Sequence, residues 1–149
     1  MEFTLKPWSA LSADELYAIL ALRAEVFVVE QRCPYQDLDG ADRDAAHLWI
    51  PDADGAPLAY ARLFPPGIKH PHASIGRVVS APSVRRHGYG RALFGEAVRR
   101  VIAAHGPVPI WIGAQKYLQR FYESFGFARS GEDYLEDGIP HLPMIRPGA

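Results

Sequence analysis

The stretch 75–94 constrains the fold of this chain most, because a β-branched run leads through a basic, glycine-spaced turn into an amphipathic helix. The run predicts a strand that ends by Pro82, since proline cannot donate a hydrogen bond to a sheet. The helix is predicted by apolar residues that share one stripe, namely Leu93, Ala97, Val101 and Ala104. The turn between strand and helix is therefore the first place to look for a binding site.

This turn has the composition of an anion-binding site. Gly88 and Gly90 lack β-carbons, so a phosphate could come close to the free N–H groups of the first helical turn, at the positive end of the helix dipole. Arginines add charge-assisted hydrogen bonds. We predict a phosphate cradle, defined as residues 85–91, in which His87 and Tyr89 contribute backbone N–H groups: Arg85, Arg86, His87, Gly88, Tyr89, Gly90 and Arg91. The competing interpretation is an ordinary strand-to-helix turn with surface arginines.

The spacing of the cradle excludes two common phosphate sites. A dinucleotide fingerprint needs a third glycine at position 93, which is Leu93, and no Gly-Lys-Ser or Gly-Lys-Thr triplet exists for a triphosphate loop. The remaining pattern, Arg85-x-x-Gly88-x-Gly90, resembles the acetyl-CoA signature of the GCN5-related N-acetyltransferases. In that family the signature holds the pyrophosphate of the cosubstrate.

A second segment strengthens this resemblance. Residues 111–127 read as a strand, a short helix and a further strand, with Leu118, Phe121, Tyr122 and Phe125 on one helical face. The run Phe-Tyr-Glu-Ser-Phe-Gly-Phe resembles the family's second motif, which implies that Tyr122 is a general acid. A core tyrosine with its hydroxyl at the rim is the alternative. The family often has Asn where this chain has Gln115, a departure in the predicted cofactor contact.

The resemblance spans nearly the whole chain and implies both a fold and a cosubstrate. The expected fold is a mixed α/β fold of the acyl-CoA N-acyltransferase type, with a mostly antiparallel central sheet flanked by helices. In the family, the strand before the cradle bulges, and the pantetheine arm pairs with its exposed backbone. The implied cosubstrate is acetyl-CoA, and the implied contacts outside the cradle are Val78, Val79, Ser80, Gln115 and Phe121.

Within the superfamily, the segments 23–31, 33–37 and 136–141, together with Asp39 and His47, resemble the ElaA-type branch. We expect the substrate side to be formed by Glu30, Gln31, Asp37, His47 and His141. Several acids there, including Asp39, Glu136 and Asp137, would attract a cationic amine, although a solvated acidic loop is the alternative for any one of them. The amine must lose a proton, and His141, His47 or, through water, Glu30 could accept it.

Arg23 falls on the same helical face as Leu16, Leu20 and Phe27, where an unpaired charge is costly. We expect it to form an ion pair with an acid of the loop 37–44. The alternative is that Arg23 forms a wall of the substrate pocket.

Composition limits the remaining classes of function. At 149 residues the chain suits one domain, 1–149, and its formal net charge of −1 lacks the basic field that nucleic-acid binding requires. Cys33 is the only cysteine, and neither a signal peptide nor a membrane span is visible, so we expect a cytoplasmic protein that does not bind membranes.

His70-Pro-His72 is a poor metal site without a third ligand, and we expect no metal. A homodimer is compatible with the resemblance, because family members often dimerise.

The order of elements agrees with a mixed sheet. Ser12 and Glu15 form a capping-box pattern that opens a helix to about residue 30. The other expected elements are a first strand at 2–6, a loop at 32–46, a hairpin of strands 47–52 and 58–64 around Asp54-Gly55, strands at 74–80 and 109–114, and final strands near 127–134 and 140–146.

These features predict an acetyl-CoA-dependent N-acetyltransferase that acetylates a primary amine of a small molecule or peptide by direct attack in a ternary complex. Cys33 lacks an activating motif for a covalent route. Two alternatives stay open. One is a non-catalytic acyl-CoA-binding or sensing module, and the other is an acyltransferase that uses another acyl-CoA or another acceptor.

Overall fold

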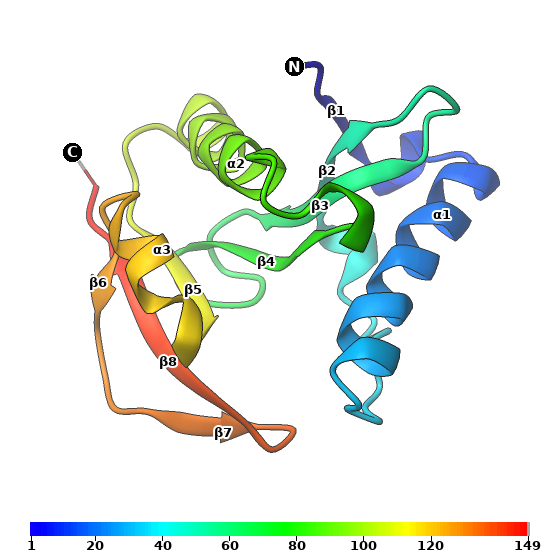
Figure 1. Cartoon of the computed structure of the whole chain (residues 1–149). Helices are drawn as coiled ribbons and strands as arrows, with labels where there is room; N and C mark the ends of the chain where they lie inside the picture. The colour runs from blue at the N-terminus through cyan, green and yellow to red at the C-terminus, as the bar shows by residue number, and fades with distance from the viewer. Residues whose placement is uncertain (149) are drawn as a thin grey trace.

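The computed structural model describes residues 1–148 and shows a mixed sheet flanked by helices (Figure 1). Among these residues the sheet has eight strands in the order β1-β2-β3-β4-β5-β8-β6, with β7 also paired to β8. The strands are β1 (Thr4–Pro7), β2 (Ala46–Pro51), β3 (Pro57–Phe64), β4 (Ala73–Ser80), β5 (Ile110–Gln115), β6 (Ala128–Arg129), β7 (Tyr134–Glu136) and β8 (Ile139–Arg146). Neighbouring strands are antiparallel except β4 and β5, which confirms the predicted fold class.

The first helix begins where its capping box predicts. The Ser12 side chain accepts a hydrogen bond from the Glu15 backbone N–H at 3.0 Å, and the Glu15 carboxylate accepts one from the Ser12 N–H at 2.9 Å. The α-helix α1 spans Ala13–Arg23, and a π-helical segment, Ala24–Glu30, continues it. The predicted single helix to residue 30 is therefore α-helical only in its first part. π-Helical turns are rare and occur often at functional sites.

The two long helices cover opposite faces of the sheet (Figure 1). Leu48 and Ile50 of β2 belong to the core beneath α2 (Tyr89–His105), whereas Trp49 between them packs with Ile19 of α1. This alternation is the two-residue period of a strand buried on both faces. The short helix α3 (Gln119–Glu123) joins the α2 side. Short 3-10 turns complete the helical elements at Trp8–Ala10, Asp42–Asp44, Pro82–Val84 and Lys116–Leu118.

The hairpin between β2 and β3 forms as predicted, with Gly55 at a left-handed φ of 88° and the Asp52 N–H bonded to the Ala56 carbonyl at 2.8 Å. The strand predicted near 127–134 is instead two short strands, β6 and β7. Between them Gly131 lies so close to Pro143 of β8 that an added β-carbon would be 2.9 Å from its ring. The Ser130 N–H still bonds to the Pro143 carbonyl at 2.9 Å, but residues 130–133 are not part of a strand.

The central strands β4 and β5 pair over a short stretch only. Their parallel register covers Ala73 with Ile110 and Ser74 with Trp111. Beyond these pairs the two strands lose their mutual hydrogen bonds, although each continues for several residues with its other neighbour. The sheet is therefore split in its middle at the carboxyl ends of β4 and β5.

Candidate active site

A cavity of about 670 Å³ lies where the sheet is split. Its walls come from the end of β4, the end of β5, the π-helical segment and the loop after it, the start of α2, the α3 region and the turn between β7 and β8. The predicted site residues that line it are Glu30, Gln31, Val78, Val79, Ser80, Arg85, Gly90, Gln115, Phe121, Tyr122 and His141. The fold thus gathers residues from both halves of the chain around one space.

A bulge on β4 forms one wall of this cavity. Arg62 pairs with Gly76 and Tyr60 pairs with Val79, so two residues of β4, Arg77 and Val78, lie opposite the single residue Ala61. Such an extra residue interrupts the ladder and leaves backbone groups of the bulged strand unpaired. On its other side, this part of β4 has no hydrogen-bonded partner in β5. The bulge predicted from the resemblance is present, and it faces the cavity.

The cradle has the backbone geometry of an anion site. Gly88 is the N-cap of α2 at a φ of 84°, and Arg86 also adopts a left-handed φ of 68°. The first hydrogen bond of the helix joins the Ala92 N–H to the Gly88 carbonyl at 3.0 Å. The N–H groups of residues 89–91 therefore have no intrahelical partner and carry the positive end of the helix dipole.

Gly90 allows the cradle to approach the end of β4. A β-carbon built at this position would lie 3.1 Å from the Ser80 hydroxyl, closer than most side chains tolerate. Gly88 has open space around it, so its requirement is the left-handed backbone instead. The two glycines are thus needed for different reasons, one conformational and one steric.

The arginines of the cradle have different environments. Arg85 lines the cavity and binds the Glu30 carboxylate through two hydrogen bonds of 2.8 and 2.6 Å. Arg91 instead lies over the rings of Phe121 and Phe125, with its guanidinium carbon 5.2 and 5.1 Å from their centres. Arg85 is therefore the side chain of the cradle that faces the cavity, whereas the residues outside its wall are Arg86, His87, Gly88, Tyr89 and Arg91.

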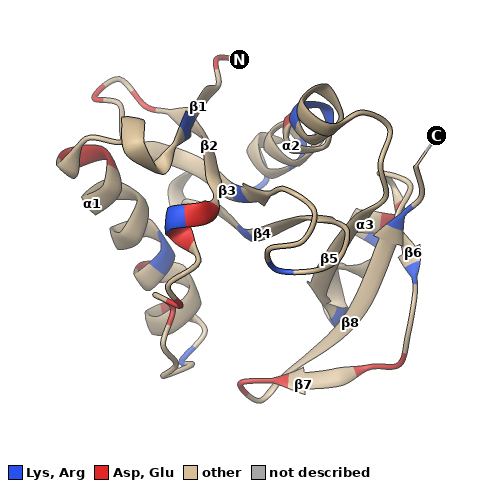
Figure 2. Cartoon of the chain, turned by 180° about the vertical axis from the view of Figure 1, so that it is seen from behind, with Lys and Arg blue, Asp and Glu red and all other residues tan. Residues whose placement is uncertain are grey.

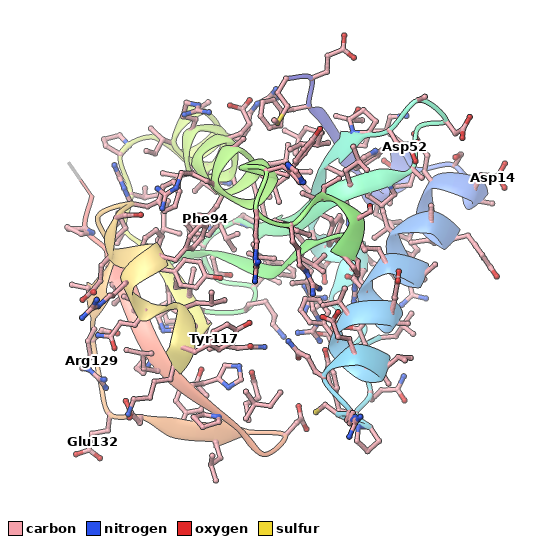
Figure 3. The ribbon with its side chains drawn as sticks, in the orientation of Figure 1. Asp14, Asp52, Phe94, Tyr117, Arg129 and Glu132 are labelled. Carbon is pink, nitrogen blue, oxygen red and sulfur yellow. The ribbon has the colours of Figure 1, made fainter. Side chains whose placement is uncertain are left out.

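Tyr122 reaches the cavity from α3. Its ring packs edge-on against Phe94 of α2, with centres 5.0 Å apart, and only 7% of the residue is exposed. Figure 3 shows Phe94 beneath α2 and Tyr117 extending from the α3 side of the molecule. Burial, with a smaller contribution from Tyr117, raises the pKa of the Tyr122 hydroxyl above its usual range. The hydroxyl is therefore protonated at neutral pH and can donate a hydrogen bond.

His141, on β8, also lines the cavity. Its Nδ1 is 2.7 Å from the Ile139 carbonyl oxygen, which can only accept, so Nδ1 carries the proton. In the neutral ring the lone pair is then on Nε2, which is 3.3 Å from the Glu136 carboxylate. The ring of His141 is thus held by the Ile139 carbonyl at Nδ1, and its Nε2 faces the Glu136 carboxylate.

Gln115 and Gln31 meet across the cavity, with the Gln115 amide nitrogen donating to the Gln31 side-chain oxygen at 3.4 Å. Cys33, next along the same loop, donates to the Asp137 carbonyl at 3.4 Å. The loop after the π-helical segment is thereby joined to β5 and to the β7–β8 turn, where Figure 2 shows acidic residues.

The structure corrects two predictions for the substrate side. His47 is fully buried outside the cavity, with Nδ1 2.7 Å from the Tyr60 hydroxyl and Nε2 2.9 Å from the Asp42 carbonyl oxygen. Burial lowers the pKa of its imidazole. Asp37 is also buried outside the cavity wall, because arginines surround its carboxylate. Neither side chain is positioned to contact a substrate.

Arg23 forms the ion pairs that we expected with the loop. The side chain is completely buried and donates to Asp37 at 3.0 Å and to Asp42 at 2.8 Å. Arg62 of β3 shares Asp42 and also binds Asp39, at 2.8 and 2.5 Å. Hydrogen bonds from Arg62 hold the pKa of Asp39 well below its usual range. The acidic loop is therefore anchored beneath the cavity by buried arginines and is not a free solvated segment.

Some cavity residues were not predicted from the sequence. Arg77 is the clearest case, since it lies in the bulge, and other polar or aromatic examples include Tyr35, Gln36, Lys69 and Tyr117. A signal existed for Arg77, because Gly76 interrupts a β-branched strand and a glycine there often marks a bulge. The loop residues lack any such local signal.

Residues 1–148 contain no cluster of three or more histidine, cysteine or acidic side chains suited to a metal ion. No helix in this part of the chain is both long enough and apolar enough to cross a membrane.

Comparison with known proteins agrees with this geometry. The family model described as an acetyltransferase (GNAT) domain matches residues 11–146. Protein ElaA of Escherichia coli is 42% identical over 142 residues, which cover 93% of this chain and 91% of ElaA. The crystal structure of an acyl-CoA N-acyltransferase from Pseudomonas aeruginosa has a TM-score of 0.90 at 42% identity, covering 98% of this chain and 99% of that one. The crystal structure of Escherichia coli ElaA also has a TM-score of 0.90, at 40% identity, covering 97% and 98%. The chain therefore belongs to the GCN5-related N-acetyltransferase (GNAT) superfamily, in its ElaA-like branch.

Proposed function

We propose that this acyltransferase uses acetyl-CoA to acetylate a primary amine of a small molecule or peptide by direct attack in a ternary complex. The observation that carries the proposal is the unpaired, bulged end of β4, which lies between the cradle and Tyr122. A pantetheine arm is an extended chain with amide groups, so it can pair with such a strand edge. Its pyrophosphate would then reach the start of α2, and its thioester would reach the side of Tyr122.

The residues around the cavity can move the protons that this reaction requires. The ammonium form of the acceptor gives one proton to Nε2 of His141, and the amine lone pair attacks the thioester carbon. The carbon–sulfur bond breaks, and Tyr122 donates its proton to the leaving thiolate. The second proton lost by the amine restores Tyr122 to its neutral form. We assign His141 rather than His47 as the base because only His141 lines the cavity.

The acceptor side favours a cation. Glu136 and Asp137 at the β7–β8 turn line the cavity near His141, and Glu30 lies at its other edge. Negative charge at the entrance attracts an amine that is protonated in solution. The buried single cysteine, Cys33, suits a reducing compartment, and we propose that the enzyme works in the cytoplasm.

Calorimetric titration with acetyl-CoA tests the proposal directly. We expect binding in the micromolar range that weakens about tenfold or more in Arg85→Ala, since a charge-assisted contact to phosphate is lost. The matched control is Arg129→Ala, which removes a surface arginine of β6 outside the cavity wall. Folded wild-type protein that binds no acetyl-CoA would contradict the proposal.

An amine screen with the bound cosubstrate then separates the alternatives. Acetylated product from wild type but little from Tyr122→Phe supports the transferase. Binding without product from any amine, equal in both proteins, would indicate a non-catalytic acyl-CoA-binding module. Faster product formation from another CoA ester than from acetyl-CoA would indicate a different acyl preference.

A further inference from the structure

The bulge on β4 contains a backbone conformation that its residue does not favour. Arg77 has a φ of 51°, in the left-handed region where a β-carbon is crowded and glycine is the usual residue. Gly76 precedes it but does not occupy the left-handed position. A non-glycine residue persists in this region only where its surroundings hold it there.

The side chain of Arg77 is held at two points by one residue, Asp37. Its Nε donates to the Asp37 carboxylate at 2.7 Å, and its Nη2 donates to the Asp37 backbone carbonyl at 3.0 Å. The guanidinium also lies over the Tyr35 ring, 5.6 Å from its centre. The bulge in the sheet is thus tied to the loop that follows the π-helical segment, 40 residues earlier in the chain.

Asp37 is in turn held by hydrogen bonds from two further side chains, those of Arg23 and Tyr35. Buried Arg23 donates to the other carboxylate oxygen of Asp37 at 3.0 Å and to its carbonyl at 3.2 Å. The Tyr35 hydroxyl donates to the same oxygen that Arg77 contacts, at 3.1 Å. The carboxylate therefore accepts three hydrogen bonds and the carbonyl two, with the side chain of Asp37 only 7% exposed. Such a buried, fully bonded group is a rigid anchor.

We infer that Asp37 and Arg77 are positioning residues that hold the β4 bulge in the form that exposes its backbone to the pantetheine arm. The inference rests on the proposed function, since it concerns the same unpaired edge of β4 with which the pantetheine arm is proposed to pair. It assigns Asp37 a role in the cosubstrate site, although the side chain is buried outside the cavity wall. Without the hydrogen bonds from Arg77 to Asp37, nothing offsets the strain of the left-handed backbone at position 77. The strand then relaxes out of its bulged conformation.

Two substitutions at position 77 separate positioning from direct contact. Arg77→Ala removes the tether and keeps the β-carbon, whereas Arg77→Gly removes the tether and also the strain. If the arginine positions the backbone, we expect CoA binding to weaken about tenfold in the alanine variant and to recover most of that loss in the glycine variant. If the arginine contacts a ligand, the two variants weaken binding equally.

Two calorimetric probes localise the effect. CoA has the whole pantetheine arm, and adenosine 3′-phosphate 5′-diphosphate keeps the pyrophosphate but lacks that arm. We expect Arg77→Ala to weaken binding of CoA alone and Arg85→Ala to weaken binding of both. Asp37→Asn, which keeps the volume but removes the charge of the anchor, is expected to follow Arg77→Ala, and Arg129→Ala is the surface control. Circular dichroism and thermal unfolding establish that each variant is folded.

The outcomes are distinct. Equal losses in Arg77→Ala and Arg77→Gly, or wild-type CoA binding in Arg77→Ala, would overturn the positioning role. Parallel loss of both probes in a folded Arg77→Ala variant would overturn it too. Wild-type protein that binds neither probe would instead contradict the proposed function.

Discussion

The carboxylate of Glu30 and the guanidinium of Arg85 form a two-point ion pair at the edge of the cavity, with hydrogen bonds of 2.6 and 2.8 Å. The pair joins the end of the π-helical segment to the cradle, 55 residues later in the chain. Arg85 is the cavity-facing arginine of the proposed pyrophosphate site, and Glu30 lies on the proposed acceptor side. We therefore expect a phosphate that binds Arg85 to compete with Glu30 for the guanidinium and to free the Glu30 carboxylate.

This competition predicts the behaviour of Glu30→Gln. The variant frees Arg85, so we expect acetyl-CoA to bind about threefold more tightly, in keeping with the small net contribution of an exposed ion pair. The KM for a cationic amine is expected to rise, because a negative charge is lost. Calorimetry and steady-state kinetics measure the two effects. Weaker acetyl-CoA binding in Glu30→Gln would show that the ion pair supports the cradle rather than competing with its ligand.

Tyr122→Phe is expected to lower kcat about a hundredfold, because the leaving thiolate loses its proton donor. The dissociation constant of acetyl-CoA should remain near the wild-type value, since the ring and its packing on Phe94 are kept. Because burial raises the pKa of Tyr122, the wild-type rate should show no loss from tyrosine ionisation up to about pH 9. Single-turnover kinetics across pH measures this. Wild-type kcat in the variant would assign the donor elsewhere.

His141→Gln tests the base. We expect kcat to fall about a hundredfold near pH 7, where an alkylamine with a pKa near 10.4 is almost wholly protonated. The deficit should shrink as the pH rises toward 9, because solvent then supplies more of the free amine. His70→Gln is the control, since His70 stacks on Trp111 outside the cavity wall. A deficit of constant size across this range would mean that His141 does not act as the base.

His47 makes the stability of the fold depend on pH. Burial lowers the pKa of its imidazole, so below the ordinary value of about 6.5 the unfolded chain binds a proton that the folded chain resists. The associated stability is complete above that pH and is lost as the pH falls through the lower, folded-state pKa. We expect the free energy of unfolding to decline as the pH falls below 6.5, by at most about 1.4 kcal/mol per pH unit from this group.

Denaturant unfolding of His47→Gln measures the contribution. The variant should show a flatter pH dependence in this window, whereas His70→Gln, whose imidazole pKa is also lowered but which is more exposed, should keep most of the slope. Asp39 and Asp42 of the buried network have pKa values below the ordinary value of about 3.9, so they titrate at still lower pH. Equal slopes in wild type and His47→Gln would refute the assignment.

The parts of the site that the sequence predicted are those made by local spacing. The cradle depends on Gly88 and Gly90 within one turn, and Tyr122 lies within one short helix, so neighbouring residues reveal them. The placements that could not be predicted depend on contacts between distant residues. Asp37 and His47 were expected on the substrate side from the resemblance to the ElaA-type branch, but contacts with Arg23, Arg77 and Tyr60 bury them within the fold.

The boundary errors have the same physical origin. The sequence predicts one strand near 127–134, because nothing local shows that Gly131 packs against Pro143 of a later strand. The predicted helix to residue 30 is correct in extent but not in type. The bulge was expected from the resemblance, but the left-handed backbone of Arg77 could not be, because its side chain is held by Asp37, 40 residues earlier in the chain.

The brief pairing of β4 with β5 has a consequence for how the molecule moves. Residues before and after this junction form two strand assemblies, β1–β4 and β5–β8, joined along the backbone by two register pairs. Each assembly keeps its own ladder, so the junction is the point at which the sheet resists opening least. A ligand bound at this junction would contact both strand assemblies and hold them together. We therefore expect the backbone amides near the ends of β4 and β5 to exchange with solvent more slowly when the ligand is bound.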